Sequence, residues 1–204
     1  MLSLARENAP DHIQDPEFQQ DLLEAVDDAL RRMDRVHERL SMLKGEITPV
    51  WQDLELSRFL KNGCRLLGKK LGAMKIALDC RTGIQAHTDP ILLSRILENL
   101  LLNALESGGD GTVVRIKVSN DDDQGQTVIE ITDNGPGIPE HLLPNELFEP
   151  FKTTKPKGTG IGLWQVERLV TSLKGSIAAE NAAEGGARFV VRLPLVGVGK
   201  FNSE

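Results

Sequence analysis

Four short stretches in the second half of the chain interrupt the apolar pattern, three of them with asparagine, aspartate or glycine and one with phenylalanine, threonine and lysine. Glycine-rich turns are common, so any one of the four could be an ordinary turn. Their order and spacing are hard to obtain by accident, and together they indicate one ligand pocket built from several elements. The stretches are Asn99-Leu-Leu-Leu-Asn103, Asp133-Asn-Gly-Pro-Gly137, the segment from Leu147 to Lys155, and Gly158-Thr-Gly-Ile-Gly-Leu163.

The chain after residue 50 alternates between helix-like and strand-like patterns. One helix begins at Asp89-Pro90, because the carboxylate can cap the first N–H groups and proline fits the first helical position. The order of elements predicts an α+β fold, with helices on one face of a mixed, mainly antiparallel sheet. The predicted strands are 53–56, 75–79, 84–87, 112–119, 126–132, 176–180 and 188–193, and the predicted helices are 57–71, 89–107 and 162–173.

The first 44 residues have a different pattern, in which apolar residues recur at alternating spacings of four and three. Residues 16–44 are predicted to form one helix, and residues 1–8 the end of an earlier helix, broken at Ala9-Pro10-Asp11. Either this hairpin packs on its own domain, or it is half of a dimerisation bundle, which the regular heptad favours. The predicted division is a helical hairpin over 1–44, a hinge over 45–49, a complete domain over 50–195 and a disordered tail over 196–204.

Composition argues against several classes of function. The chain has 204 residues, 40% of them hydrophobic, and a formal net charge of −6 without a long basic run. A globular core is therefore expected, and nucleic acid is not an expected partner. Cys64 and Cys80 lie far apart and near no histidine pair, which argues against zinc and for free thiols in a reducing compartment. No apolar run approaches the roughly 20 residues that span a bilayer.

Asn99 and Asn103 are one helical turn apart, so both amides project from one face of their helix. The residues between them are leucines, and a buried amide without a partner costs about 1–3 kcal/mol. One interpretation is that the amides cap neighbouring backbone groups. The other is that their carbonyl oxygens bind Mg²⁺, which proteins usually hold with few side chains, water and substrate phosphates.

Asp133-Asn-Gly-Pro-Gly-Ile138 directly follows a strand of alternating apolar residues. This pattern fits a plain turn, and it also fits a site for a base. A carboxylate at a strand end can accept a hydrogen bond from the exocyclic amine of adenine, whereas guanine would place a second acceptor against it. Gly135 and Gly137 would allow the backbone to approach the base closely.

The stretch from Gly158 to Leu163 leads directly into a helix, where backbone amides freed by glycine can bind phosphate. It is neither a dinucleotide fingerprint nor a P-loop, because no buried strand precedes it and no Lys-Ser/Thr pair follows it.

The segment from Leu147 to Lys155 is predicted to be a lid that orders on the ligand. Phe148 and Phe151 are expected to anchor it, while Thr153, Thr154 and Lys155 lie where they could meet phosphate. For Lys155 a solvated charged loop remains the alternative.

The four stretches resemble the asparagine box, first glycine box, phenylalanine box and second glycine box of the GHKL ATP-binding fold. Histidine kinases, DNA gyrase, a heat-shock chaperone family and the mismatch-repair ATPases share this fold, a two-layer sandwich of a mixed sheet and helices. The N-terminal hairpin is similar to the tail of a histidine-kinase dimerisation and phosphotransfer domain. Three further stretches resemble the sensor kinase of PEP-CTERM/exopolysaccharide systems, namely Leu2-Ser-Leu-Ala-Arg-Glu-Asn8, Asp15-Pro-Glu-Phe-Gln-Gln20 and Glu98-Asn-Leu-Leu-Leu-Asn-Ala-Leu105.

The resemblance implies ATP and Mg²⁺ as ligands and a role for each matching residue. Asn103 would be the main Mg²⁺ ligand, Asn99 a ligand of the metal or a phosphate, and Asp133 the partner of the adenine amine. The glycines of the first box would shape the adenine slot, and those of the second box would hold the phosphates. The implied nucleotide-binding set is Asn99, Asn103, Asp133, Gly135, Gly137, Ile138, Phe148, Thr153, Thr154, Lys155, Gly158, Thr159, Gly160, Ile161, Gly162 and Leu163.

Gyrase-like ATPases place a water-activating glutamate four residues before the metal asparagine, and here that position is Asn99. Slow hydrolysis and transfer to a protein acceptor are therefore expected. Glu98 is adjacent but points off the asparagine face, and a catalytic role for it beside Asn99 is a further expectation.

The acceptor histidine of the family lies in an earlier helix, within a His-Asp/Glu-x-x-Asn/Pro type motif, and this chain has no such motif. His37-Glu38 lacks the following Asn or Pro. All four histidines, His12, His37, His87 and His141, are therefore interpreted as structural or surface residues. The chain is expected to bind ATP without phosphorylating itself.

The leading hypothesis is the catalytic part of a two-component histidine kinase, with a response-regulator aspartate as the final acceptor. The resemblance also implies a homodimer in the intact parent and a location at the cytoplasmic side of a bacterial inner membrane. Two alternatives stay open: an anti-sigma-type serine kinase, against which the long heptad helix argues, and a nucleotide-gated dimerisation module without catalysis.

Overall fold

The computed structural model describes residues 19–20, 22–23, 26, 47–71, 74–109, 111–143, 146–155 and 158–195. The chain divides into two units, residues 1–46 and residues 47–204. In the first unit, the described residues between Gln19 and Val26 are helical. Most of the predicted helix 16–44, its predicted break at 9–11 and the predicted tail at 196–204 lie outside the described residues. The predicted domain boundaries stay a prediction.

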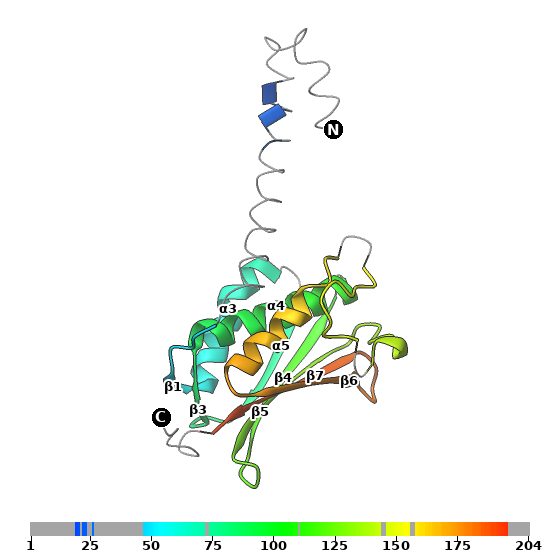
Figure 1. Ribbon diagram of the computed structural model, residues 1–204. Coiled ribbons are helices and arrows are strands. Elements are labelled where there is room, and N and C mark those ends of the chain that lie inside the picture. The colour runs from blue at the N-terminus through cyan, green and yellow to red at the C-terminus, as the bar shows by residue number, and fades with distance from the viewer. Residues whose placement is uncertain are drawn as a thin grey trace. The chain divides into compact units, whose positions relative to one another are not determined.

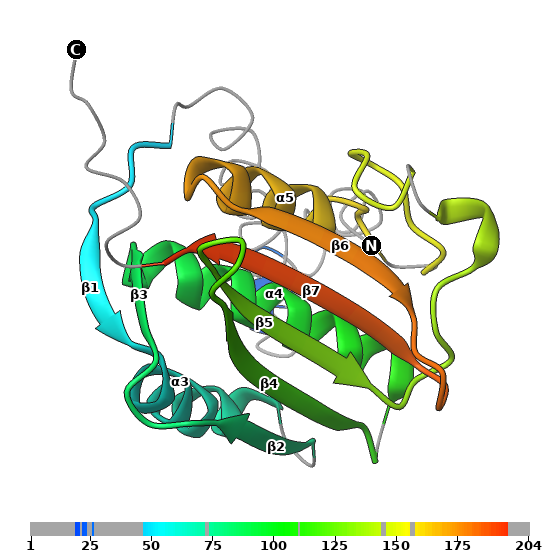
Figure 2. The ribbon, with the colours of Figure 1, turned by 90° about the horizontal axis from the view of Figure 1, so that it is seen from below.

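A five-stranded sheet with the order β2-β4-β5-β7-β6 forms the base of the second unit (Figure 2). β2 (Lys75–Cys80) pairs parallel with β4 (Val113–Asp121). β5 (Gln126–Asp133), β7 (Ala187–Pro194) and β6 (Ser176–Asn181) follow, and each of these neighbours pairs antiparallel. One parallel pair beside antiparallel ones is the mixed, mainly antiparallel sheet that the sequence predicts.

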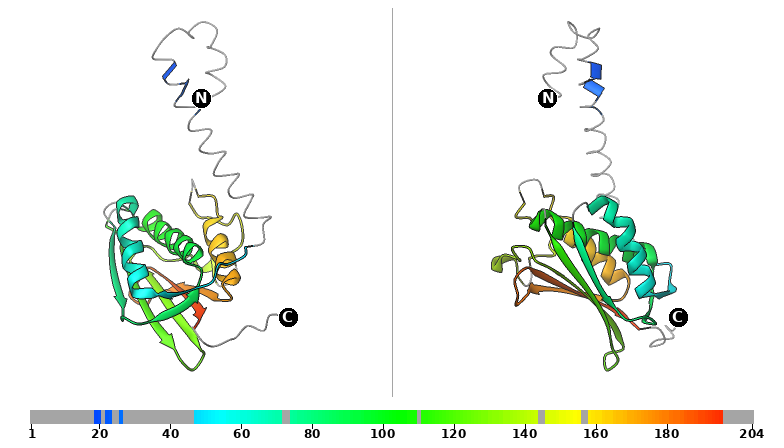
Figure 3. Two further views of the ribbon diagram at one scale, coloured as in Figure 1. Left: turned by 90° about the vertical axis from the view of Figure 1, so that its left-hand side faces the viewer. Right: turned by 180° about the vertical axis from the view of Figure 1, so that it is seen from behind.

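Three helices, α3 (Leu56–Leu71), α4 (Pro90–Gly108) and α5 (Gly162–Ser172), cover one face of this sheet (Figures 1 and 3). Alternate side chains of the central strands point to that face, because successive residues of a strand point to opposite sides. The core between the layers includes Val114, Ile116, Val118, Ile129, Ile131 and Phe189 from the strands, and Leu93, Ile96, Leu97, Leu100, Leu101 and Ala104 from α4.

A second, two-stranded sheet is formed by β1 (Gln52–Glu55) and β3 (Gln85–Thr88), which pair antiparallel. Trp51 stacks on His87 with ring centroids 5.4 Å apart, and His87 Nδ1 lies 2.7 Å from Asp53 Oδ1. These contacts fix the segment that enters the domain.

Asp89 connects this segment to α4. Its Oδ1 accepts hydrogen bonds from the N–H groups of Ile91 and Leu92 at 2.8 and 3.1 Å. Its Oδ2 accepts a third, from the N–H of Val50 at 2.7 Å. The predicted helix start is therefore confirmed, and the same carboxylate also holds the incoming chain.

Each strand and helix predicted between residues 53 and 193 is confirmed, with bounds that differ by at most two residues. The sequence reading missed a single 3₁₀ turn at Glu140–Leu142, which is too short to produce a periodic pattern. In the part of the chain that the structure describes, no helix has both the length and the apolar character that crossing a membrane requires.

Candidate nucleotide-binding site

Residues along α4 lie next to each of the other predicted stretches. Asn99 faces the first residue of α5, where a Cβ would lie 3.5 Å from Asn99 Oδ1. One turn further on, Asn103 Oδ1 accepts a hydrogen bond from Lys155 Nζ at 2.8 Å. At the C-terminal end, a Cβ on Gly135 would lie 3.7 Å from the backbone of Gly108. The helix rises roughly 14 Å between Asn99 and Gly108, a length suited to an extended nucleotide.

Asp133 is a buried carboxylate at the end of β5, with 7% of its surface exposed. It is in phase with Ile129 and Ile131, so its side chain points to the face that the helices cover. Its Oδ1 accepts hydrogen bonds from the N–H groups of Gly135 at 2.8 Å and Ala187 at 3.1 Å. Among the described residues no group donates to Oδ2. One oxygen is therefore fixed by the backbone, and the other is left as an acceptor.

The turn before β7 positions Asp133, and sequence reasoning missed it. Gly186 has a φ of 85°, and a Cβ there would overlap the carbonyl oxygen of Asp133. The neighbouring Ala187 donates its N–H to the carboxylate. The visible signal was the pair Gly185-Gly186 directly before a strand. Its partner could not be identified from sequence, because the contact depends on the pairing of β5 with β7.

Asn181, at the end of β6, is a second residue that sequence reasoning missed. Its Oδ1 accepts the N–H of Ile138 at 2.6 Å, and its Nδ2 donates to the carbonyl of Ile138 at 2.9 Å. Gly137 precedes this clamp with a φ of 81°, and a Cβ there would lie 2.6 Å from Asn181 Oδ1. The second glycine of the Asp-x-Gly-x-Gly turn is thus required by a side chain about 40 residues away in sequence.

The glycine loop leads into α5 without a side-chain cap. Ile161 occupies the N-cap position, and no side chain of the described residues bonds the first N–H groups of the helix. Gly160 has a φ of 64°, and its carbonyl accepts the N–H of Phe151 at 2.9 Å. A Cβ on Gly158 would overlap Thr153 Oγ1. The glycines therefore allow the lid segment, residues 147–155, to lie against the loop.

The two phenylalanines of the lid segment behave differently. Phe148 is half-buried and packs against the core, as predicted. The prediction that Phe151 is an anchor is wrong, because its side chain is 67% exposed. Phe151 has a φ of 67°, which accompanies its backbone contact with Gly160 and leaves the ring in solvent. Thr153, Thr154 and Thr159 are exposed, and Thr153 Oγ1 accepts the N–H of Lys155 at 3.1 Å.

Lys152 links the lid segment to the residues that precede it. Its Nζ lies 2.8 Å from Glu146 Oε2 and 3.6 Å from Glu149 Oε2. The hydrogen bond with Glu146 raises the pKa of Lys152, and the same bond lowers the pKa of Glu146. Both side chains are more than a third exposed, so solvent screens this link and it is weak.

Oxygen atoms suited to Mg²⁺ are present on α4. Asn99 donates its Nδ2 to the carbonyl of Arg95 at 2.9 Å, so its Oδ1 turns toward α5. The oxygens of Asn103 and Glu106 face Lys155. Amide and carboxylate oxygens are the donors that this ion prefers. In the described part of the chain, no group of three or more His, Cys, Asp or Glu side chains could hold a metal. A bound Mg²⁺ would therefore depend on these amide oxygens together with phosphates.

Glu98 and the four histidines were also named from the sequence. Glu98 is half-buried beside Asn99, and its catalytic role stays a prediction. His87 is engaged by Asp53 and Trp51, and His141 is exposed on the 3₁₀ turn. His12 and His37 lie outside the described residues.

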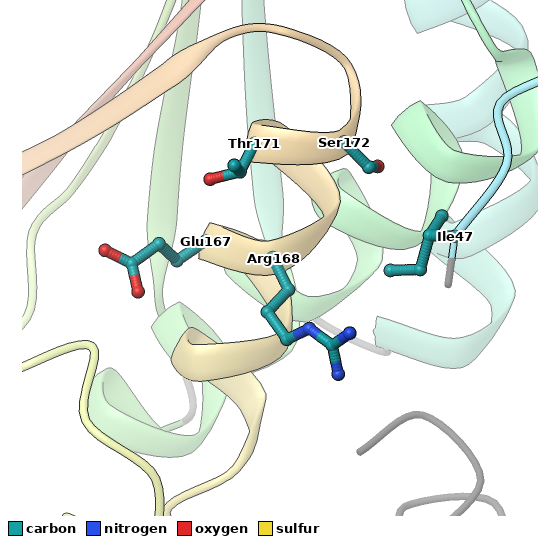
Figure 4. A pocket seen from close by; sticks show the side chains of 5 residues that line it. All are labelled: Ile47, Glu167, Arg168, Thr171 and Ser172. Atoms are coloured by element: carbon teal, nitrogen blue, oxygen red, sulfur yellow. The ribbon is translucent and has the colours of Figure 1, made fainter. Parts of the chain in front are cut away.

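A cavity of about 280 Å³ lies beside the second half of α5 (Figure 4). It is lined by Ile47, Glu167, Arg168, Thr171 and Ser172. None of the predicted nucleotide-binding residues contributes to it, so it is not the site that the sequence predicts.

Comparison with known proteins agrees with this geometry. Residues 88–197 match the family described as histidine kinase-, DNA gyrase B-, and HSP90-like ATPase. The chain is similar to the signal transduction histidine-protein kinase AfsQ2 of Streptomyces coelicolor, with 42% identity over 123 residues, 58% of this chain and 22% of that protein. It is also similar to the sensor protein kinase PilS of Pseudomonas aeruginosa, with 33% identity over 174 residues, 82% of this chain and 32% of that protein.

Solved structures share the fold. The histidine kinase ThkA, in its complex with the response regulator protein TrrA, superposes with a TM-score of 0.71 at 21% identity, over 93% of this chain and 55% of that chain. This chain spans about a fifth and about a third of the two curated relatives named above (22% and 32%). The matched family covers residues 88–197, which include all four predicted boxes, and the chain therefore belongs to the histidine kinase-, DNA gyrase B- and HSP90-like ATPases and carries their ATP-binding domain in the form found in sensor histidine kinases.

Proposed function

We propose that residues 47–195 bind ATP with Mg²⁺ along α4 and transfer its γ-phosphate to a histidine outside this chain, for onward transfer to a response-regulator aspartate. The observation that carries this proposal is the state of Asp133. Two backbone N–H groups hold one oxygen of its buried carboxylate, while the other oxygen has no donor among the described residues. This second oxygen is not among the fully buried side-chain atoms that lack a partner in the described residues, so it is accessible to a ligand that donates to it.

Adenine supplies such a donor through its exocyclic amine, and guanine does not. Gly135 lies against Asp133 Oδ1 and the end of α4, and Gly137 and Ile138 are held by Asn181. These residues would form the walls of the base slot. We expect strong preference for ATP over GTP, because a carbonyl facing the carboxylate leaves both acceptors unpaired.

The phosphates would lie toward the start of α5. Within the described part of the chain its first N–H groups have no side-chain cap, and an uncapped helix N-terminus favours an anion. Gly158, Gly160 and Gly162 would allow the phosphates to approach the backbone. Asn103 and Asn99 would hold Mg²⁺, which neutralises charge on the transferred phosphate.

The acceptor is inferred from chemistry and from the relatives. AfsQ2 is a histidine-protein kinase by name, PilS is a sensor protein kinase, and the ThkA structure contains a response regulator. Asn99 occupies the position where water-hydrolysing relatives carry a glutamate, which favours transfer over hydrolysis. His87 is already bonded to Asp53 and stacked on Trp51, so it is poorly placed to accept phosphate.

Several finer properties belong to the same proposal. The domain would begin after a hinge at residues 45–49, and the N-terminal helices would pair in a homodimer of the intact protein. The parent would act at the cytoplasmic side of a bacterial inner membrane. The narrower resemblance to the PEP-CTERM/exopolysaccharide sensor kinase stays a prediction.

The test is incubation of the chain with Mg²⁺ and γ-labelled ATP, following label on protein and free phosphate, beside calorimetric binding of ATP and GTP. We expect ATP binding, no label on the chain and little free phosphate. Asp133→Asn keeps an oxygen for Gly135 and Ala187 but turns an amine toward the base, and should weaken ATP binding about ten- to hundredfold. Asp123→Asn, in the exposed turn between β4 and β5, is the matched control.

The same experiment separates the alternatives. Acid-labile label would identify one of the four histidines as an acceptor, and acid-stable label would indicate a serine kinase. If a separately produced kinase helix that carries an acceptor histidine is added, that helix should become labelled. If ATP binds tightly and no acceptor is ever labelled, including in the full-length parent, the domain is a nucleotide-gated module. Absence of ATP binding would refute the proposal as a whole.

A further inference from the structure

Three oxygen atoms converge on the ammonium of Lys155. Asn103 Oδ1 lies 2.8 Å from Nζ, the carbonyl oxygen of Asn103 lies 3.3 Å away, and Glu106 Oε2 lies 2.9 Å away. Asn103 and Glu106 are three residues apart on α4 and so share one helix face. The lid segment thus places a cation against the amide oxygen that is proposed to bind Mg²⁺.

Lys155 and a metal ion cannot use Asn103 Oδ1 in this way at the same time. Mg²⁺ binds oxygen at about 2.0–2.1 Å, and an ammonium at hydrogen-bond distance from the same oxygen would be next to it. Two positive charges so close repel strongly. The oxygens that suit a divalent cation are therefore the ones that hold the lysine.

The contacts of Lys155 are also weak enough to be exchanged. The side chain of Glu106 is 61% exposed and that of Lys155 is 27% exposed, so solvent screens their ion pair. The two bonds from Nζ to Asn103, one to its amide oxygen and one to its backbone carbonyl, each add only a modest net stability, because they replace bonds to water. A divalent cation carried by a nucleotide could replace the ammonium without unfolding any part of the domain.

Displacing Lys155 would loosen the lid segment. The N–H of Lys155 donates to Thr153 Oγ1, and its carbonyl accepts the N–H of Gly158 in the glycine loop. The lid segment also contains Phe151 in the left-handed region, a conformation that bulky residues rarely adopt. The link between the Lys155 side chain and α4 is a further contact that holds this segment to the domain.

We propose that Lys155 competes with Mg²⁺ for the amide oxygen of Asn103, so that the lysine latches the lid segment to α4 and leaves when the metal–nucleotide binds. This inference rests on the proposed function, because it takes Asn103 as a metal ligand. The latch couples the metal site on one helix to the lid on a different part of the chain.

The test is calorimetric binding of the non-hydrolysable analogue AMPPNP to the full chain at a series of free Mg²⁺ concentrations. Lys155→Met keeps the aliphatic stem and removes the ammonium. The Mg²⁺ concentration that gives half of the metal-dependent gain in affinity should then fall about three- to tenfold, which is within what the two hydrogen bonds to Asn103 and the exposed ion pair to Glu106 supply. Glu106→Gln weakens the hold on the lysine and should shift the same concentration in the same direction by a smaller factor.

Lys152→Met is the matched control, because Lys152 lies in the same segment but bonds Glu146 and Glu149 instead of α4. It should leave the Mg²⁺ dependence unchanged. A second readout is hydrogen exchange without nucleotide, where Lys155→Met should speed exchange at the N–H of Gly158 and Lys152→Met should not.

The outcomes are distinguishable. If the wild-type chain does not bind AMPPNP at any Mg²⁺ concentration, the proposed function itself fails. If it binds and Lys155→Met leaves the half-saturating Mg²⁺ concentration unchanged or raises it, only the latch is refuted. An increase for Glu106→Gln would refute it too, since Glu106 would then be serving the metal and not the lysine.

Discussion

At the scale of single residues, the hydrogen bonds around Asp133 explain how a carboxylate can stay buried at the end of β5. Charged groups are expensive to remove from water unless they are bonded. Here two backbone N–H groups, from Gly135 and Ala187, hold one oxygen. Gly135 lies in the turn after β5, and Ala187 begins β7 directly after Gly186, whose backbone passes beside that of Asp133.

Gly185 and Gly186 provide a matched pair for testing this contact. Both have positive φ, 93° and 85°, but a Cβ on Gly185 meets nothing within 4 Å while one on Gly186 overlaps the Asp133 carbonyl. Gly185→Ala should cost about 1–2 kcal/mol of unfolding free energy from backbone strain alone. Gly186→Ala should cost about 2–5 kcal/mol, because overlap adds to the strain, and should also weaken ATP binding. Urea unfolding measures both, and equal losses would contradict this account.

At the scale of elements, the N-termini of α4 and α5 differ in how their first N–H groups are bonded. The Asp89 carboxylate accepts three hydrogen bonds, two from N–H groups at the start of α4 and one from Val50 in the entering chain. Among the residues that the structure describes, no side chain caps the first N–H groups of α5. The difference matches the roles proposed for them, because α4 needs a fixed start to position its asparagines, whereas α5 needs free donors for phosphate.

Asp89 can be tested with two substitutions that separate its two oxygens. Asp89→Ala removes the cap and the bond to Val50, and should destabilise the domain by about 1–2 kcal/mol or somewhat more. Asp89→Asn keeps an oxygen that can cap α4, because asparagine caps about as well as aspartate, and loses the acceptor for Val50. It should cost about 1 kcal/mol. Chemical denaturation decides this, and an unchanged midpoint for Asp89→Ala would show that the cap is unimportant.

At the scale of the whole domain, the proposed ligand would connect parts that are far apart in sequence. α4 lies next to the lid at Asn103, to α5 at Asn99 and to the Asp133 turn at Gly108. A nucleotide lying along this helix would contact all of them in the folded state and none of them together in the unfolded chain. Its binding energy would therefore add directly to folding stability.

Thermal unfolding with and without ligand measures this link. ATP with Mg²⁺ at a hundredfold excess over its Kd should stabilise the folded state by about 2.7 kcal/mol, which corresponds to a rise in Tm of about 5–10 °C for a domain of this size. Removing Mg²⁺ with EDTA should reduce the rise, and GTP at the same concentration should give little. Equal shifts with ATP and GTP would contradict the assignment of Asp133 to adenine.

The elements of the domain were predictable because each carries a local signal. Alternation along β4 and β5 places Ile116 and Ile129 on one face, and Asp89-Pro90 marks the start of a helix. The candidate residues Asn99, Asn103 and Asp133 were also visible, since polar groups interrupt apolar patterns there. The error at Phe151 arose because sequence does not report the sign of φ at a single non-glycine residue.

The sequence alone determined the order of strands and helices, the layer that the helices form and the family of the domain, because periodicity and short motifs are local properties of the chain. Only the tertiary structure decided which groups meet. Asn181 clamps Ile138 from a strand 43 residues away, Ala187 fixes Asp133 across 54 residues, and Lys155 reaches α4 across 52. These contacts depend on how the strands pair and on where a loop returns to a helix, and no local pattern encodes that.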